Sequence, residues 1–193
     1  MTLTKAALRS DMHARRAGLS AAEREGATKA LAAHAGQLLS LAAGVQALTV
    51  STYWAIGPEL DPKPLETALI GRGATLCLPV MAGRAKPLVF RKFEQGDALV
   101  ERTWGIKEPS ELAAVVVPDL LLVPLLAVDL TGARLGYGGG FYDRTLRHLR
   151  STRTIVAVGV AFAVQVVDAV PTETYDERLD WLVTPGGLAR CRS

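Results

Sequence analysis

Cysteine is scarce in this 193-residue chain, which has only Cys77 and Cys191. The two lie far apart, with no second Cys or His at a familiar zinc spacing, so neither a disulfide framework nor a zinc cluster is expected. Long apolar runs are also missing, because the longest, residues 120–128 and 155–164, fall well short of the roughly 20 residues that cross a bilayer. We therefore expect no membrane segment. The charges scattered through the N-terminal 25 residues argue against a secretory signal and favour a cytoplasmic location.

Neither basic nor acidic residues are in large excess. The chain has 22 basic and 19 acidic residues, a formal net charge of +3, which favours anionic ligands only mildly. The longest consecutive basic stretch is a pair, such as Arg15 and Arg16, so no nucleic-acid partner is expected. The 49% hydrophobic content is typical of a folded globular protein.

Hydrophobic spacing predicts the elements of the fold. Leu8 and Met12 indicate a helix over residues 4–18, and Ser20 with Glu23 has the spacing of a capping box that opens a second helix toward residue 43. Short apolar or β-branched segments predict strands at residues 47–54, 75–80, 88–93, 120–128 and 154–162.

Helical stretches at residues 62–72 and 141–150 fall between these strands. Such alternation is typical of a parallel sheet that is covered on both faces. We expect an α/β fold, a three-layer α/β/α arrangement with an open, mostly parallel sheet and N-terminal helices. No linker-like composition interrupts it, so residues 1–193 are expected to form a single domain.

A glycine-rich loop follows the predicted strand 120–128 and opens the predicted helix 141–150. Gly136, Gly138, Gly139 and Gly140 would let backbone amides approach a phosphate, and the helix start offers free amides and a positive dipole. The loop is not a P-loop, which needs Lys and Ser/Thr after its last glycine, nor a dinucleotide fingerprint, whose third glycine would fall on Phe141. It predicts a different phosphate site, with a flexible turn as the alternative.

Several carboxylates have two possible uses. Asp143, at the start of the helix, can cap it or hold Mg²⁺ with a second carboxylate. Candidates for that second ligand, or for a solvated surface, are Glu173, Asp176, Glu177 and Asp180. Asp129 is expected to be structural, because a carboxylate that opens a turn ending at Gly132 can accept local backbone hydrogen bonds.

Basic side chains follow one face of the first helix. Lys5 and Arg9 are four residues apart and can grip successive phosphates, although basic pairs on helices are commonly only solvated. Arg16 extends this stripe, and its loss is expected to have little effect.

Aromatic residues are few, with four Phe, four Tyr and three Trp. Five of them could form a flat pocket in which Glu59 accepts hydrogen bonds from a heteroaromatic amide, or each could simply pack in the core or at its rim. These five are Tyr53, Trp54, Trp104, Tyr137 and Tyr142.

Residues 134–143, RLGYGGGFYD, together with Val123-Pro124, Asp129 and Gly132 before them, resemble the signature of the 5-formyltetrahydrofolate cyclo-ligase family, also called 5,10-methenyltetrahydrofolate synthetases. Other pieces stand in family order across nearly the whole chain: Lys5, Arg9, Glu59, residues 104–109 (WGIKEP) and Asp176. Some members carry Arg and Lys where this chain has Tyr137 and Gly139, and Tyr in place of Phe141. Because Tyr137, Gly139 and Phe141 carry no charge, the groups that neutralise phosphate would be Arg134, Lys5, Arg9 and the backbone amides.

The resemblance implies a ligase that uses ATP and Mg²⁺, and we expect the protein to be a monomer. It would convert 5-formyltetrahydrofolate, with or without a polyglutamate tail, to 5,10-methenyltetrahydrofolate through a phosphorylated formyl (iminium phosphate) intermediate and release ADP and phosphate. It assigns ATP to Lys5, Arg9 and the loop residues Arg134, Leu135, Gly136, Tyr137, Gly138, Gly139, Gly140, Phe141 and Tyr142. It assigns Mg²⁺ to Asp143 and Asp176, the folate to Trp54, Glu59 and Trp104, and catalytic roles to Arg134, Tyr142 and Asp143.

Two other functions stay compatible with these residues. A sugar-phosphate isomerase or ligand sensor on a similar sheet would use the same loop without turning over ATP, because a fold does not determine function. A non-catalytic module would hold 5-formyltetrahydrofolate without converting it. Nucleotide-dependent product formation separates all three.

Overall fold

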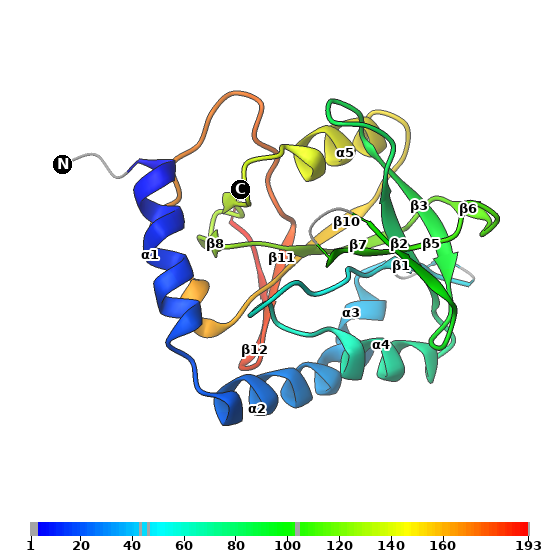
Figure 1. Cartoon of the computed structure of the whole chain (residues 1–193), viewed down its shortest axis with the longest axis horizontal. Coiled ribbons are helices and arrows are strands. Elements are labelled where there is room, and N and C mark those ends of the chain that lie inside the picture. Colours follow the sequence, from blue (N-terminus) through cyan, green and yellow to red (C-terminus); the bar gives the residue numbers. More distant parts are fainter. Residues whose placement is uncertain (1–3, 43, 46, 103–104, 193) are drawn as a thin grey trace.

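The structure is a computed structural model that describes residues 4–42, 44–45, 47–102 and 105–192. Within these residues an eight-stranded sheet crosses the middle of the molecule (Figure 1). Its strands, in spatial order, are β12 (Gly187–Arg190), β11 (Trp181–Thr184), β10 (Val156–Val160), β7 (Leu120–Pro124), β1 (Thr49–Ser51), β2 (Thr75–Met81), β3 (Leu88–Phe93) and β6 (Val115–Val116). Neighbours from β11 to β2 are parallel, and the outer pairings are antiparallel.

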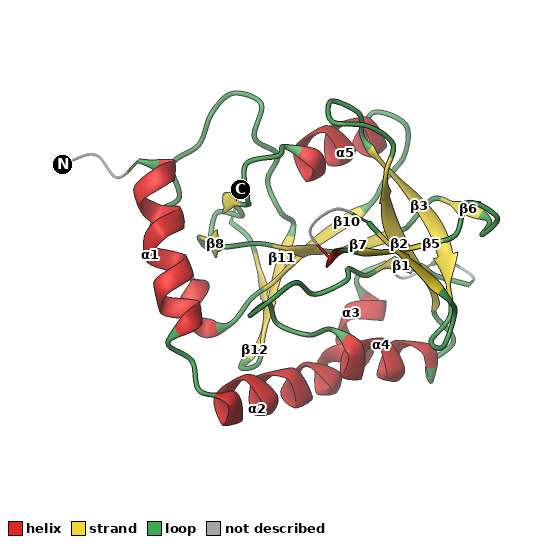
Figure 2. Ribbon diagram, viewed as in Figure 1, coloured by secondary structure: helices red, strands yellow, loops and turns green. Residues whose placement is uncertain are grey.

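Helices cover both faces of this sheet, as Figure 2 shows. On one face lie α2 (Ala21–Leu31), the short 3₁₀ turn η1 (Ala32–His34), α3 (Ala35–Ser40) and α4 (Lys63–Ile70), and on the other lies α5 (Phe141–Arg150). A further helix, α1 (Lys5–Ala17), closes one end of the molecule beside β8 (Ala127–Val128). The predicted α/β architecture with a mostly parallel sheet and N-terminal helices is confirmed.

The position of β7 in the middle of the sheet explains why its sequence is continuously apolar. Leu120 and Leu122 pack into the core beneath α2, α3 and α4, whereas Leu121 and Val123 pack into the core beneath α5. Successive side chains of a strand point to opposite faces, and here both faces are covered. All four side chains are completely buried.

Both predicted N-terminal helix starts are present. The Thr4 hydroxyl accepts a hydrogen bond from the Ala7 amide, and Ser20 and Glu23 form the reciprocal capping box. The prediction of one helix from residue 20 to 43 is wrong, because the chain tightens into η1 after Leu31 and α3 ends at Ser40. This bend keeps Leu31 and the residues of α3 that face the sheet within one core.

Three predicted strands are shorter than expected. Residues 47–54 yield only β1, residues 154–162 yield β10, and residues 120–128 divide into β7 and β8. Pro124 ends β7 because it has no amide hydrogen with which to continue the ladder. The chain then leaves the main sheet, and β8 pairs with β9 (Arg134–Leu135). A second small sheet, β4 (Leu99–Glu101) with β5 (Lys107–Pro109), was not predicted.

The turn between β8 and β9 confirms the structural role of Asp129. Its Oδ1 accepts from the amide of Thr131 at 2.8 Å, and its Oδ2 accepts from the amide of Val170 at 2.8 Å. Gly132 has a φ of +80°, and a Cβ at this position would lie 2.3 Å from the carbonyl oxygen of Leu179. Only glycine fits there, so this turn holds the start of the glycine loop against the segment before β11.

No described helix has the length and apolar character needed to cross a membrane.

Candidate active site

The glycine loop, residues 136–140, connects β9 to α5. Gly138 and Gly140 have φ values of +97° and +64°, in the left-handed region that glycine adopts without strain. Gly140 is also the N-cap of α5, so the first free amides of the helix lie at the end of the loop. The local geometry is that of a phosphate-binding turn at a helix N-terminus.

Two arginines bracket this loop. Arg9 of α1 donates from Nε to the carbonyl oxygen of Gly136 at 3.0 Å, and a Cβ at Gly138 would lie 3.6 Å from its guanidinium. Arg144 of α5 donates to the carbonyl oxygen of Gly139 at 2.8 Å and to that of Arg84 at 2.9 Å. The loop is therefore fixed between α1, α5 and the β2–β3 turn, with positive charge on both sides.

Arg134 and Asp143 form an ion pair behind the loop. Arg134 Nη2 donates to Asp143 Oδ1 at 2.7 Å, and the amide of Glu177 donates to the same oxygen at 3.1 Å. Arg134 also donates to the carbonyl oxygen of Glu177. Burial lowers the pKa of Arg134, although Asp143 acts in the opposite direction. Asp143 thus faces Arg134 and also stands in the first turn of α5, where an acidic side chain is favourable, while Gly140 holds the N-cap position.

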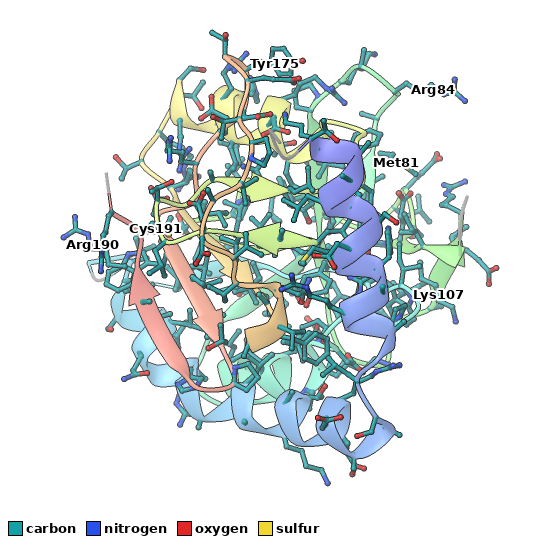
Figure 3. All side chains as sticks on the ribbon, turned by 90° about the vertical axis from the view of Figure 1, so that its left-hand side faces the viewer. Met81, Arg84, Lys107, Tyr175, Arg190 and Cys191 are labelled. Carbon is teal, nitrogen blue, oxygen red and sulfur yellow. The ribbon has the colours of Figure 1, made fainter. Side chains whose placement is uncertain are left out.

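Lys5, at the start of α1, contacts the segment before β11. Its Nζ donates to Asp176 Oδ2 at 2.7 Å and to Glu173 Oε2 at 3.0 Å. Partial burial lowers the pKa of Lys5, but these two hydrogen-bonded carboxylates outweigh it, so the pKa lies above its ordinary value. In Figure 3, which looks onto α1, Tyr175 of this segment and Arg84 project at the end of the molecule where α1 begins.

Both predicted metal ligands act on Arg134: Asp143 binds it directly, and the charge of Asp176 partly offsets the lowering of its pKa by burial. The hydrogen bonds of Asp143 to described residues all use Oδ1, and those of Asp176 use Oδ2, so each carboxylate has a second oxygen outside these bonds. Among the described residues no group of three or more His, Cys, Asp or Glu side chains could hold a metal ion. This donor set fits Mg²⁺ bound by one or two carboxylates together with phosphate oxygens and water, not a complete protein cage.

Glu59 faces the glycine loop. Its Oε1 accepts from the hydroxyl of Tyr137 at 2.7 Å, and its Oε2 accepts from the amide of Ile56 at 2.8 Å. The hydroxyl of Tyr137 in turn accepts from Arg16 Nη2 at 2.7 Å. Burial and the nearby Glu59 carboxylate raise the pKa of Tyr137 to about 12. Arg16, whose loss was expected to have little effect, is only 2% exposed and so does not belong to a solvated helix face.

Trp54 follows the end of β1. The ammonium groups of Lys63 and Lys107 lie 5.1 and 5.2 Å from its ring centroid. Trp54 lines a cavity of about 570 Å³ together with Tyr53 and the buried Glu66. Glu59, Tyr137 and Tyr142 are not among the residues that line it, so the predicted aromatic residues do not share one pocket. Trp104 lies outside the described residues.

Sequence reasoning gave Arg144 no role, expected little effect from the loss of Arg16, and considered Glu177 only as a possible second metal ligand. A signal for Arg16 was present, because Lys5, Arg9 and Arg16 at spacings of four and seven share one helix face. No comparable signal indicated that the backbone of Glu177 would bind both Arg134 and Asp143.

The fold and the site define the class: an α/β protein whose glycine-rich loop opens a helix and is bracketed by arginines, as in proteins that bind phosphate groups. Comparison with known proteins makes this specific. The chain belongs to the 5-formyltetrahydrofolate cyclo-ligase family, whose model matches residues 1–185. It is therefore a ligase of folate metabolism, and membership of the family implies the use of ATP.

Relatives support this over most of the chain. It is 36% identical over 190 residues to the 5-formyltetrahydrofolate cyclo-ligase of Mycolicibacterium smegmatis, covering 94% of each chain. It is 38% identical over 146 residues to the enzyme of Escherichia coli K12, covering 73% of this chain and 80% of that one. The solution structure of 5,10-methenyltetrahydrofolate synthetase from Aquifex aeolicus superimposes with a TM-score of 0.81 at 29% identity, covering 99% of this chain and 94% of that chain.

Proposed function

We propose that this chain converts 5-formyltetrahydrofolate to 5,10-methenyltetrahydrofolate in a reaction that requires ATP and Mg²⁺. Family membership supports the cyclo-ligase activity. The observation that carries the ATP site is the glycine loop, held between Arg9 and Arg144 at the start of α5. Amides and guanidinium groups there match the charge of a triphosphate.

The chemistry accounts for a site without a protein nucleophile. The formyl oxygen attacks the γ-phosphorus of ATP, an O–P bond forms, and ADP leaves, which gives an iminium phosphate. The N10 nitrogen then attacks the former formyl carbon and loses its proton to solvent, the C–O bond breaks, and phosphate leaves as the ring closes. Phosphoryl transfer depends on positioning and charge neutralisation, which Lys5, Arg9, Arg134 and the amides of residues 136–142 supply.

Asp143 and Asp176 would hold the Mg²⁺, which neutralises phosphate charge when bound. Arg134 and the amide of Glu177 orient the Asp143 carboxylate, and Lys5 orients that of Asp176. Burial raises the pKa of Tyr142, so its hydroxyl stays protonated and is a hydrogen-bond donor for phosphoryl oxygens.

The folate side of the site consists of Glu59, Trp54 and Trp104. A carboxylate accepts two hydrogen bonds from the adjacent ring amide and exocyclic amino group of a pterin, and an indole packs on the ring face. Lys63 and Lys107 beside Trp54 support a substrate whose tail carries extra glutamate carboxylates.

We further propose that the enzyme is monomeric and cytoplasmic, with residues 1–193 as one domain.

One assay tests this function. Purified protein with 5-formyltetrahydrofolate, Mg²⁺ and ATP should develop the absorbance of the methenyl product and release ADP and phosphate in equal amounts. Phosphate-ligand binding without product would favour an isomerase or sensor, and folate binding without ADP release would favour a non-catalytic folate module. Either result would refute the proposed reaction.

A further inference from the structure

The hydroxyl of Tyr137 joins two parts of the protein that are far apart in the sequence. It accepts from Arg16 on α1 and donates to Glu59 after β1, each at 2.7 Å. Tyr137 itself belongs to the glycine loop. One phenol therefore connects the proposed nucleotide loop, the first helix and the proposed folate carboxylate.

Arg16 depends on this link for charge compensation. Its side chain is buried, its Nε has no hydrogen-bond partner among the described residues, and no carboxylate of the described residues forms an ion pair with it. A buried guanidinium without a counter-charge is strongly destabilising. The hydrogen bond from Arg16 to the Tyr137 hydroxyl leads on to the Glu59 carboxylate, so Tyr137 bridges a separated ion pair.

The same link fixes the glycine loop. The ring of Tyr137 is 52% exposed, so packing holds it only in part and its hydroxyl provides directional contacts. On either side of Tyr137, the carbonyl oxygen of Gly136 accepts from Arg9, and a Cβ at Gly138 would lie 3.6 Å from the Arg9 guanidinium. A displacement of the loop would therefore change a hydrogen bond of Glu59, and a displacement of Glu59 would change the loop.

We propose that Tyr137 is a positioning residue that couples nucleotide binding at the glycine loop to folate binding at Glu59. This inference rests on the proposed function. A carboxylate accepts about four hydrogen bonds, so Glu59 can retain Tyr137 and Ile56 while it accepts two donors from a pterin. Both ligands then stabilise the same arrangement of Tyr137. Each should strengthen the binding of the other by an equal factor, as linkage requires.

The experiment measures the dissociation constant of 5-formyltetrahydrofolate with and without a non-hydrolysable ATP analogue and Mg²⁺. In the parent protein the analogue should tighten folate binding about fivefold or more, within the usual range of coupling between sites. In Tyr137→Phe this factor should fall below about twofold, and the reverse titration should give matching factors. Steady-state kinetics should show raised KM values for both substrates with kcat largely retained.

Two further variants serve as controls. Arg16→Gln should weaken the coupling as Tyr137→Phe does, and the double variant should lose little more, since both remove the same link. Arg15→Gln should keep the parent factor, because Arg15 is half-exposed and its ion pair among the described residues is with Asp11 on the same helix. Thermal unfolding of each variant separates loss of coupling from loss of folding.

Equal coupling factors in the parent and in Tyr137→Phe would overturn the inference, and so would a parent in which the analogue leaves folate affinity unchanged. A parent that binds folate and nucleotide but forms no product would refute the proposed reaction while the coupling is still measurable. The two failures are therefore distinguishable.

Discussion

Replacing Asp143 separates its contribution to stability from its proposed role at the metal. The side chain of Arg134 is 6% exposed and that of Asp143 is 25% exposed. In Asp143→Ala the buried guanidinium of Arg134 loses the carboxylate that it pairs with but keeps its hydrogen bond to the carbonyl oxygen of Glu177. Breaking a buried ion pair costs about 3–5 kcal/mol, and because water reaches Asp143 we expect about 2–3 kcal/mol.

In a chain of this length each kcal/mol lowers Tm by about 2–4 °C, so Asp143→Ala should melt roughly 4–12 °C below the parent. Asp143→Asn keeps an acceptor for Arg134 and for the amide of Glu177 and loses only the charge. About half of that shift is expected. The proposed metal role predicts a different pattern in the kinetics, with both variants losing roughly a hundredfold or more in kcat.

The assay combines thermal unfolding by far-UV circular dichroism with ATP-dependent formation of the methenyl product across a Mg²⁺ titration. Asp119→Asn is the matched control, because Asp119 also pairs with an arginine, Arg153, and accepts from the amide of Thr49. It should lower Tm without lowering kcat. Full activity of Asp143→Asn at saturating Mg²⁺ would refute the metal role and leave Asp143 as a partner of Arg134 alone.

Three further substitutions test the rest of the site. Arg9→Ala should weaken ATP binding roughly ten- to a hundredfold in the absence of folate, because it removes a charged group beside the loop. Equal ATP affinities of variant and parent in calorimetry would contradict this. Glu59→Gln should weaken folate binding roughly ten- to a hundredfold in the absence of nucleotide, a loss of about 1–3 kcal/mol in binding free energy. A lower Tm with unaltered folate affinity would contradict the pterin role. Burial raises the pKa of Glu66 above its ordinary value of 4.5. Just above pH 4.5 the Glu66 carboxyl therefore stays protonated in the folded protein and is ionised in the unfolded chain. The free energy of unfolding then falls as the pH rises through the folded-state pKa. Urea unfolding of Glu66→Gln from pH 4 upward should lack this decline, and parallel curves for parent and variant would exclude it.

Most of the fold could be predicted because its elements carry local signals. The ranges of β3 and α5 match the predicted segments, and the Ser20 capping box begins α2 as expected. The errors have local causes too. Pro124 ends β7 early, and β11 and β12 were overlooked although Pro185-Gly186 between them is a hairpin signal. Strands of three residues, such as β4, are too short to show a period.

The site was predictable only as separate pieces. The glycine loop and the basic face of α1 are local patterns, but their contacts join residues that are distant in sequence. Lys5 and Asp176 are 171 positions apart, and they were expected to bind phosphate and metal separately, yet they bind each other. Such pairings depend on where the sheet brings the chain together, which no window of the sequence contains.

The burial of Arg16 also could not be predicted from a local pattern. Its position on the face of Lys5 and Arg9 was visible, but a charged side chain on a helix is ordinarily solvated. What removes it from water is the glycine loop, which lies over α1 because Arg9 binds Gly136 and Tyr137 reaches on to Glu59. The importance of Arg16 thus follows from Tyr137, a residue at which some family members carry arginine. An arginine at position 137 would bring a second positive charge toward the buried guanidinium, so we expect such a substitution here to destabilise the protein unless Arg16 is replaced as well.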